Sequence, residues 1–214
     1  MKRETVRFLL LRHGEVTAPP GALYGQTDVP LSPRGAIQSR EAACALNGAG
    51  ICRIVTSDLA RCRFLADALG EVAGVPVEAD PKIREVDFGA WSGLTWKEID
   101  AREPGAFAAR LRDFEDFRPP GGENIRDLAD RTWQTFEGLM NETQRGTVAI
   151  VTHAGVNRVI LARLMGIPFA RILSLAQDFC CANVVDIYPD GAATLRLLNG
   201  RPEHAGSMAL GVPS

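Results

Sequence analysis

The stretch VRFLLLRHGEV, residues 6–16, is an apolar run of strand length that ends at Arg12 and His13. A strand buried on both faces reads as a continuous apolar run, whereas a strand with one face in solvent alternates apolar and polar residues. The stretch therefore predicts a buried strand that carries two basic side chains to its carboxyl end. AIVTHAG, residues 149–155, repeats the design with His153 and a glycine after an apolar run.

Strand-like and helical segments alternate outward from this first strand. Helices are indicated by a serine or asparagine at the start, a proline in the first turn, or apolar residues spaced by three and four. Two late runs separated by the turn PDG have the pattern of a hairpin. We expect strands at 6–11, 51–57, 75–79, 147–152, 183–188 and 193–198. Helices are expected at 33–47, with Ser32 as N-cap and Gly48 past the end, and at 59–72, 124–140 and 156–166.

This alternation predicts an α/β fold, a three-layer α/β/α sandwich whose sheet is mostly parallel with an antiparallel edge. At 214 residues the chain is expected to form one domain over residues 1–214. Residues 81–122 contain two tryptophans and several glycines and are expected to form a small lid-like excursion. From about residue 201 we expect a flexible tail.

Composition excludes several classes of function. A formal net charge of -2 gives no basic surface for nucleic acid or an anionic membrane. No run approaches the ~20 apolar residues of a membrane-spanning helix, and the first residues lack the apolar region of a secretory signal. The five cysteines are odd in number and show no CxxC spacing, so we expect reduced thiols and a cytoplasmic location. The oligomeric state is left open.

Basic groups are predicted to gather at the carboxyl ends of the parallel strands, where ligands bind in such sheets. Arg12 and His13 follow the first strand, Arg61 stands near the start of a helix after the second, and His153 follows a later one. Guanidinium groups and the free N–H groups of a helix start bind phosphate oxygens. The adjacent glycines would let backbone approach the ligand. These features predict a phosphate pocket that contains a histidine.

A histidine among cations is expected to stay neutral and to keep a free lone pair, which makes it a nucleophile for phosphorus. Attack forms a phosphohistidine that water then hydrolyses. The leaving alkoxide needs a proton, so a carboxylic acid must stand nearby. IREVDFGAWSG, residues 83–93, offers both Glu85 and Asp87, and spacing alone does not choose between them.

Each of these residues has an ordinary interpretation when taken singly. A histidine at a strand end is usually a hydrogen-bonded surface group, and Arg61 would be a solvated helix-face side chain. Their convergence at one sheet edge favours a site. The chain lacks the phosphate-binding loop motif, the dinucleotide motif and the G-x-S-x-G elbow, and its histidines lack metal-ligand spacing. We therefore expect neither a metal nor a cofactor.

Six motifs in this order resemble the histidine phosphatase superfamily, also called the phosphoglycerate mutase-like family. The resemblance implies a phosphoglycerate mutase-like fold and His13 as the phosphorylated nucleophile. It also implies that Arg12, Arg61 and His153 bind the phosphate and that Glu85, not Asp87, is the proton donor. The motifs are LLLRHGEV (9–16), YGQTDVPLSPRG (24–35), TSDLARCR (56–63), REVDFGAWSG (84–93), PGGEN (120–124) and VTHAGVNR (151–158).

The chain departs from the family at one phosphate contact. Members often carry an asparagine a few residues after RHGE, whereas this chain has VTAPPG with Pro19 near that place. Gln26 is the substitute that we expect to supply a substrate-binding polar group.

The resemblance implies a metal-independent phosphomonoesterase that acts on a small-molecule phosphate monoester. ARLMGIP (162–168) and ATLRLLNGR (193–201) resemble the α-ribazole phosphatases of cobalamin synthesis, which makes α-ribazole 5'-phosphate the first candidate substrate. The alternatives are a cofactor-dependent phosphoglycerate mutase, a broad-specificity sugar-phosphate phosphatase and a phosphate-binding pseudoenzyme. The compact excursion favours hydrolysis, because family mutases carry longer segments over the site.

Overall fold

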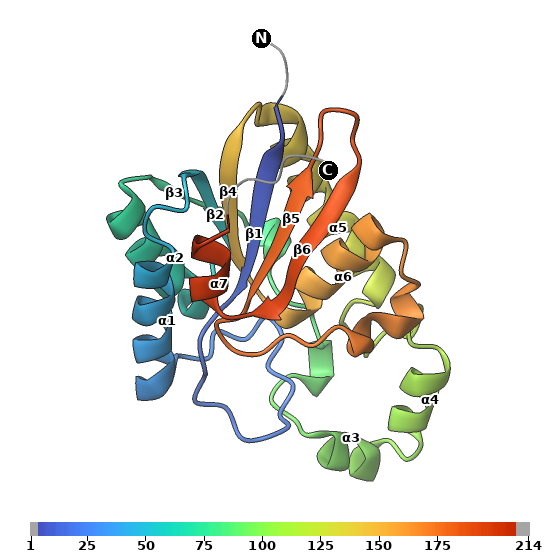
Figure 1. Ribbon diagram of the computed structural model, residues 1–214. Helices are drawn as coiled ribbons and strands as arrows, with labels where there is room; N and C mark the ends of the chain where they lie inside the picture. Colours follow the sequence, from blue (N-terminus) through green and yellow to red (C-terminus); the bar gives the residue numbers. More distant parts are fainter. Residues whose placement is uncertain (1–3, 209–214) are drawn as a thin grey trace.

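A computed structural model describes residues 4–208 and contains one six-stranded sheet with helices on both faces (Figure 1). The strand order is β3-β2-β4-β1-β5-β6. The first four are mutually parallel, and the β5–β6 hairpin adds the antiparallel edge. This confirms the predicted fold class. The strands are β1 (Val6–Arg12), β2 (Ile51–Thr56), β3 (Val77–Ala79), β4 (Gly146–Thr152), β5 (Ala182–Ile187) and β6 (Ala193–Gly200).

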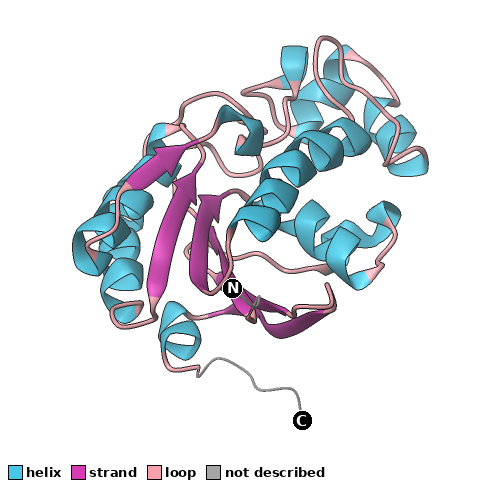
Figure 2. Cartoon of the chain, turned by 90° about the horizontal axis from the view of Figure 1, so that it is seen from above, coloured by secondary structure: helices cyan, strands magenta, loops and turns pink. Residues whose placement is uncertain are grey.

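Helices cover the two faces of the sheet and enclose two apolar cores (Figure 2). Helices α5 and α6 pack over one core, and α1, α2 and α7 over the other. The helices are α1 (Pro33–Ala45), α2 (Ala60–Ala73), α3 (Trp96–Arg102), α4 (Ala106–Arg112), α5 (Ile125–Glu142), α6 (Ala154–Met165) and α7 (Pro202–Gly206), with 3₁₀ turns η1 (Pro81–Ile83), η2 (Gly89–Trp91) and η3 (Phe169–Ser174).

The first strand occupies the middle of this arrangement, between β4 and β5. Its side chains alternate between the two apolar cores, which is why the sequence shows an unbroken apolar run. Arg7 is the exception, and its guanidinium pairs with the carboxylate of Asp186 on β5 at 2.7 Å. This ion pair fixes the register of β1 relative to β5. It thereby also fixes the position of the carboxyl end of β1, where Arg12 and His13 lie.

Helix ends follow the capping residues that the sequence contains. Ser32 accepts a hydrogen bond from the backbone N–H of Gly35 and starts α1. Thr95 and Glu98 form a complete capping box at α3, as their spacing predicts. The first helix ends at Ala45, before the glycine at 48 that was expected to follow its end.

The expectation of a flexible tail from about residue 201 is wrong for residues 202–206. They form α7, in which Pro202 and Ala205 are buried. A Cβ on Gly206 would lie 2.3 Å from the carbonyl oxygen of Ala45, so the helix is docked closely on the end of α1. Residues 209–214 of the expected tail lie outside the described residues.

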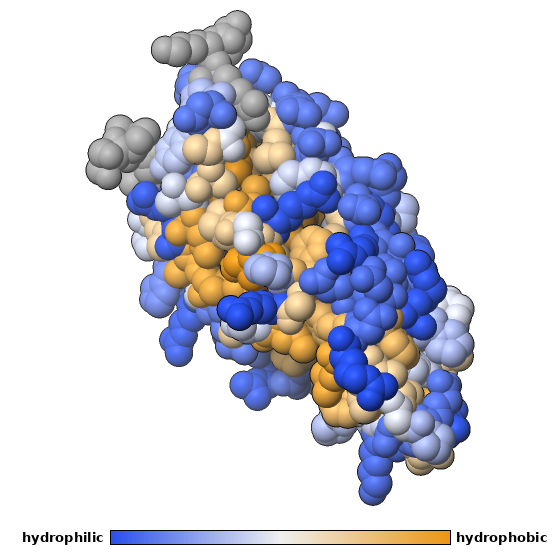
Figure 3. Space-filling view, turned by 90° about the vertical axis from the view of Figure 1, so that its right-hand side faces the viewer, coloured by the Kyte–Doolittle hydropathy of each residue, from blue (hydrophilic) through white to orange (hydrophobic). Residues whose placement is uncertain are grey.

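The excursion at about 81–122 holds η1, η2, α3 and α4 and stands beyond the carboxyl ends of the parallel strands (Figure 1). Figure 3 shows the side of the molecule that faces right in Figure 1, where hydrophobic surface is interrupted by hydrophilic residues. Among residues 4–208, no helix has the length and apolar character needed to cross a membrane. The excursion lies on the same side of the sheet as the carboxyl ends that carry the predicted site residues.

Candidate active site

Two histidines leave neighbouring parallel strands at the same sheet edge. Arg12 of β1 is paired in register with Thr152 of β4, so the next residues, His13 and His153, emerge side by side. Their ring centroids are 5.2 Å apart. His13 is 1% exposed and His153 is fully buried. The structure thus brings together the two histidines that the repeated sequence pattern singled out.

Two arginines flank these rings. Arg61 lies in the first turn of α2, and its two terminal nitrogens donate to the carbonyls of Thr27 at 2.8 Å and Gly25 at 2.6 Å. Arg12 donates to the carbonyl of Gln177 at 2.5 Å. These carbonyls orient the guanidinium groups without neutralising them. The Nε atoms of both arginines are buried and have no hydrogen-bond partner among the described residues, so donors are left over for an anion.

The protonation state of His13 follows from its surroundings. Burial, with the charges of Arg12 and Arg61, lowers the pKa of His13 well below its ordinary value. Its Nδ1 lies 2.7 Å from the carbonyl oxygen of Gly14, and because a carbonyl only accepts, Nδ1 carries the hydrogen. The neutral ring therefore has its lone pair on Nε2, as a nucleophile requires.

His153 has a different set of contacts. Its Nε2 lies 2.9 Å from the hydroxyl of Ser57, at the end of β2. Burial, followed by His13 and the nearby arginines, lowers the pKa of His153. Cys62 Sγ lies 3.5 Å from the same nitrogen, and burial raises the pKa of this thiol, so it stays protonated. Sequence reasoning did not assign Ser57 to the site, although its place directly after the second strand was a usable signal.

Glu85 contacts the segment that follows His153, at Gly155 in the first turn of α6. Its carboxylate accepts hydrogen bonds from the backbone N–H of Gly155 at 3.1 Å and of Val86 at 3.0 Å. A Cβ on Gly155 would lie 2.2 Å from Glu85 Oε1. Because Gly155 has no side chain, the Glu85 carboxylate can approach its backbone. The sequence analysis predicted that this glycine lets the backbone approach a ligand instead. Asp87 instead accepts from the backbone N–H of Gly89 within its own turn at 2.8 Å.

Arg131 of α5 holds the segment that carries Glu85. Its terminal nitrogens donate to the carbonyl oxygens of Arg84 at 2.7 Å and Glu85 at 2.9 Å. The same guanidinium forms an ion pair with Glu123 at 2.6 Å. The sequence analysis did not identify Arg131, because the spacing of the apolar residues in this helix predicts only which residues face the core.

Gln26 lies next to Gly25, whose carbonyl anchors Arg61, and is half-buried. No hydrogen bond joins its side chain to another residue in the described part of the chain. Pro19 is exposed. The substrate-binding role of Gln26 therefore stays a prediction.

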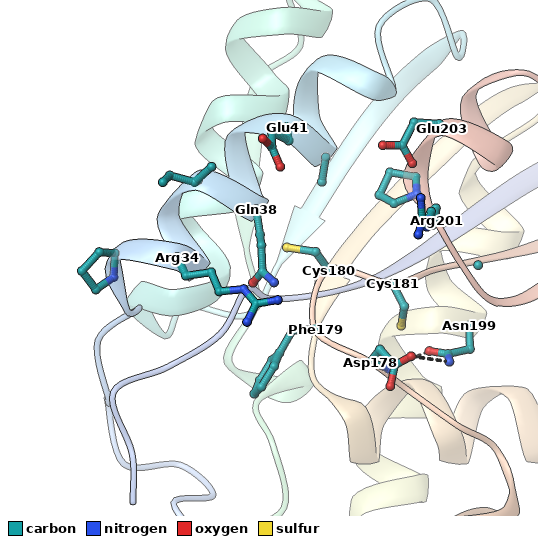
Figure 4. Close-up of a pocket in the computed structure, with 15 residues that line it drawn as sticks. Arg34, Gln38, Glu41, Asp178, Phe179, Cys180, Cys181, Asn199, Arg201 and Glu203 are labelled. Atoms are coloured by element: carbon teal, nitrogen blue, oxygen red, sulfur yellow. Dashed lines mark hydrogen bonds between the residues drawn. The ribbon is translucent and has the colours of Figure 1, made fainter. Parts of the chain in front are cut away.

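Two cavities lie near the histidines, and neither is lined by His13, by His153 or by the two arginines of the predicted phosphate site. The larger one measures about 730 Å³ and is lined by Phe179, Cys180 and Cys181 (Figure 4), and the Phe179 ring is 5.8 Å from that of His13. A smaller cavity of about 260 Å³ contains Glu85 and Gly155. Of these two cavities, the smaller one is lined by the carboxylate that the sequence analysis predicts as the proton donor.

Comparison with known protein families gives a match over residues 8–200 to the histidine phosphatase superfamily (branch 1). Among curated relatives, a glucosyl-3-phosphoglycerate phosphatase of Mycolicibacterium vanbaalenii is 38% identical, with 76% of this chain and 75% of the relative covered. An adenosylcobalamin/alpha-ribazole phosphatase of Salmonella typhimurium is 29% identical, with 92% of this chain and 97% of the relative covered.

Solved structures show the same fold. A putative alpha-ribazole-5'-P phosphatase from Escherichia coli superposes with a TM-score of 0.84 at 27% identity, covering 97% of this chain and 99% of that chain. A mycobacterial glucosyl-3-phosphoglycerate phosphatase in complex with inorganic phosphate superposes with a TM-score of 0.81 at 30% identity, covering 92% and 98% of the two chains.

Proposed function

This chain belongs to the histidine phosphatase superfamily, and we propose that it hydrolyses phosphate monoesters through a phosphohistidine at His13, without a metal. Phosphatases of this superfamily are its relatives by sequence and by structure. The observation that carries the mechanism is the free lone pair on His13 Nε2, held beside two guanidinium groups with unpaired buried donors.

The first half of the reaction transfers the phosphoryl group to the protein. The phosphate binds against Arg12 and Arg61, and Nε2 of His13 forms a bond to phosphorus as the ester P–O bond breaks. Glu85 in its acid form gives its proton to the departing alkoxide. Because the arginines are fixed by backbone carbonyls before substrate arrives, they stabilise the transferring charge without reorganisation.

The second half regenerates the protein. The Glu85 carboxylate takes a proton from a water molecule, the oxygen attacks phosphorus, and the P–N bond to His13 breaks. Inorganic phosphate leaves, His13 returns to the neutral form, and Glu85 is again the acid. The ring centroid of His153 stands 5.2 Å from that of His13, in reach of the phosphoryl oxygens. Burial and then the neighbouring basic groups lower the pKa of His153, and a bound phosphate dianion opposes this lowering.

Substitution of His13 tests this proposal. His13→Ala should abolish turnover while the protein stays folded, because the covalent step loses its nucleophile. The matched control is His204→Ala, since His204 is exposed on α7. Brief mixing of the wild type with labelled phosphate ester should yield a labelled protein that His13→Ala does not form. More than a trace of activity in His13→Ala would overturn the mechanism.

Two substrates follow from the relatives. α-Ribazole 5'-phosphate is supported by the similarity to the Salmonella and Escherichia coli proteins, and a phosphoglycerate ester by the similarity to the mycobacterial ones. We place the reaction in the cytoplasm, with the excursion at 81–122 as a lid over the pocket. A panel of phosphomonoesters that includes both substrates and sugar phosphates, scored by kcat/KM, selects among them.

The same panel separates hydrolysis from the mutase alternative. A phosphatase releases inorganic phosphate from 3-phosphoglycerate, whereas a mutase forms 2-phosphoglycerate without net release. A pseudoenzyme would bind phosphate and turn over no member of the panel.

A further inference from the structure

One short segment contacts both of the basic residues that follow β1. Residues 177–181 lie between η3 and β5, and residues 178–181 line the larger cavity (Figure 4). The backbone N–H of Arg12 donates to the carbonyl of Cys181 at 3.2 Å, and the N–H of Cys180 donates to the carbonyl of His13 at 3.1 Å. These hydrogen bonds fix the 177–181 segment against the two residues that open the proposed phosphate site.

The same segment orients the guanidinium of Arg12. Nη1 of Arg12 donates to the carbonyl of Gln177 at 2.5 Å, and the guanidinium carbon lies 4.0 Å from the centre of the Phe179 ring. The carbonyl fixes one edge of the planar group and the ring fixes its plane, while Nε stays buried without a partner among the described residues. The position of this segment therefore sets the direction in which Arg12 offers its free donor to an anion.

A buried amide holds the segment in place. Gln177 is 4% exposed, and its side chain uses all four of its hydrogen-bonding positions. Oε1 accepts from Nδ2 of Asn157 on α6 at 3.0 Å and from Nδ2 of Asn183 on β5 at 2.9 Å. Nε2 donates to Oδ1 of Asn183 at 2.8 Å and to the carbonyl of Ala176 at 2.7 Å. Because any displacement would leave buried polar atoms unpaired, this network resists movement of the segment.

Backbone contacts decide which way these amides point. Nδ2 of Asn183 also donates to the carbonyl of Leu10 at 3.0 Å, and its Oδ1 accepts from the N–H of Asn199 at 2.9 Å. A carbonyl only accepts and an N–H only donates, so the amide of Asn183 cannot be turned over, and the paired amide of Gln177 is fixed with it. Leu10 lies on β1, the strand that ends at Arg12. The network therefore joins Gln177 to the same strand whose arginine its carbonyl orients.

We propose that Gln177 is a positioning residue for the phosphate site: its side chain holds the 177–181 segment, and its main-chain carbonyl thereby holds Arg12 in the orientation that binds the phosphoryl group. The inference rests on the proposed function and adds a residue that acts through Arg12. Donors that are oriented before the substrate arrives stabilise the transferring charge without reorganisation. An apolar side chain of the same length would fill the same space but would not hold the segment.

Gln177→Met tests this role, because methionine keeps the length of the side chain and removes its four hydrogen bonds. The buried amides of Asn157 and Asn183 then lose their partner, and we expect the segment to shift until water reaches them. A misplacement of about 1 Å costs on the order of 10²-fold in rate, so kcat/KM for nitrophenyl phosphate should fall by about ten- to hundredfold. The dissociation constant of inorganic phosphate, measured by calorimetry, should rise by a similar factor.

The choice of probe separates this effect from one on the proton donor. Nitrophenolate departs without a proton, so a loss on nitrophenyl phosphate does not arise from Glu85. Combining Arg12→Ala with Gln177→Met then identifies the group through which Gln177 acts. The double variant should match Arg12→Ala within about twofold in kcat/KM and in phosphate affinity, because no arginine is left to misplace.

Asn157→Ala is a milder change to the same network. Oδ1 of Asn157 is buried without a hydrogen-bond partner among residues 4–208, so alanine removes only the side-chain hydrogen bond to Gln177. We expect kcat/KM to fall by about two- to tenfold, the range that one hydrogen bond supplies. This loss should also vanish when Arg12 is already alanine.

Thr132→Val is the matched control for the loss of a buried hydrogen bond. The hydroxyl of Thr132 donates to carbonyls of its own helix α5, at 2.8 Å to Leu128 and at 3.2 Å to Ala129. The change should lower the free energy of unfolding and leave both kcat/KM and phosphate affinity unchanged. A role for Gln177 in stability alone would make every variant behave like this control.

The outcomes separate the inference from the function on which it depends. Unchanged kcat/KM and phosphate affinity in folded Gln177→Met would overturn the inference, as would losses that multiply with those of Arg12→Ala. Where Gln177→Met does not fold, Asn157→Ala decides by the same two criteria. If the wild type releases no phosphate from nitrophenyl phosphate, the proposed function is wrong, and phosphate affinity alone then tests the role of Gln177.

Discussion

Replacing Gly155 by alanine should lower the catalytic rate while leaving the free energy of unfolding nearly unchanged. A Cβ at this position would lie 2.2 Å from Oε1 of Glu85, well inside the 3.0 Å that real Cβ contacts respect. The carboxylate has to retreat by the better part of an ångström and loses its 3.1 Å hydrogen bond to the Gly155 N–H. Because the obstructed atom is the far end of a flexible side chain, the backbone need not move.

The expected magnitudes follow from that displacement. A misplacement of about 1 Å costs on the order of 10²-fold in rate, and general acid catalysis supplies about 10²–10⁴-fold in all. We therefore expect kcat for alkyl phosphates to fall by about 10²- to 10³-fold. Gly155 lies in the first turn of α6, where alanine favours the helix, so the free energy of unfolding should change by no more than about 1 kcal/mol.

The assay compares two leaving groups. Nitrophenolate departs without a proton, so Gly155→Ala should lose less than about tenfold on nitrophenyl phosphate, a small part of the general-acid contribution. Gly138→Ala in α5 is the matched control, because a Cβ there meets no atom within 4 Å. Equal losses on alkyl and nitrophenyl esters, or full activity on both, would refute the placement of the acid at Glu85.

Three further predictions address the acid, the histidines and the metal. Glu85→Gln should show the same leaving-group dependence as Gly155→Ala, and a uniform loss would mean that Glu85 is not the proton donor. His13 and His153 have a lowered pKa in the folded protein, so the unfolded chain binds more protons below about pH 6.5. The free energy of unfolding, measured by urea titration, should then fall from pH 7 to pH 5 by at most about 1.4 kcal/mol per pH unit for each histidine. The decrease should be smaller in His13→Ala. A free energy of unfolding that does not change over this pH range contradicts the lowered pKa values of the two histidines. Dialysis against EDTA should leave activity unchanged, and a loss that a divalent ion restores would contradict the metal-free mechanism.

The sheet and the meeting of the histidines could be predicted because both depend on local patterns. The run at residues 6–12 is mostly apolar because both faces of this strand are covered by apolar cores. Since β1 and β4 are parallel neighbours, their carboxyl ends lie at the same edge of the sheet. The choice between Glu85 and Asp87 could not be made this way. It depends on which carboxylate meets Gly155, a contact between segments 70 positions apart in the chain.

The tail and the excursion also contain features that could not be predicted from the sequence. Residues 202–206 look polar in sequence, yet α7 docks because Gly206 allows close approach to Ala45, a feature that no periodicity reveals. Arg110 is followed by the exposed Leu111 and Arg112 in ARLRDF, and its burial is the property that distinguishes it from Arg112. The burial of a charge is a property of the packed molecule, because it depends on which neighbours surround the side chain.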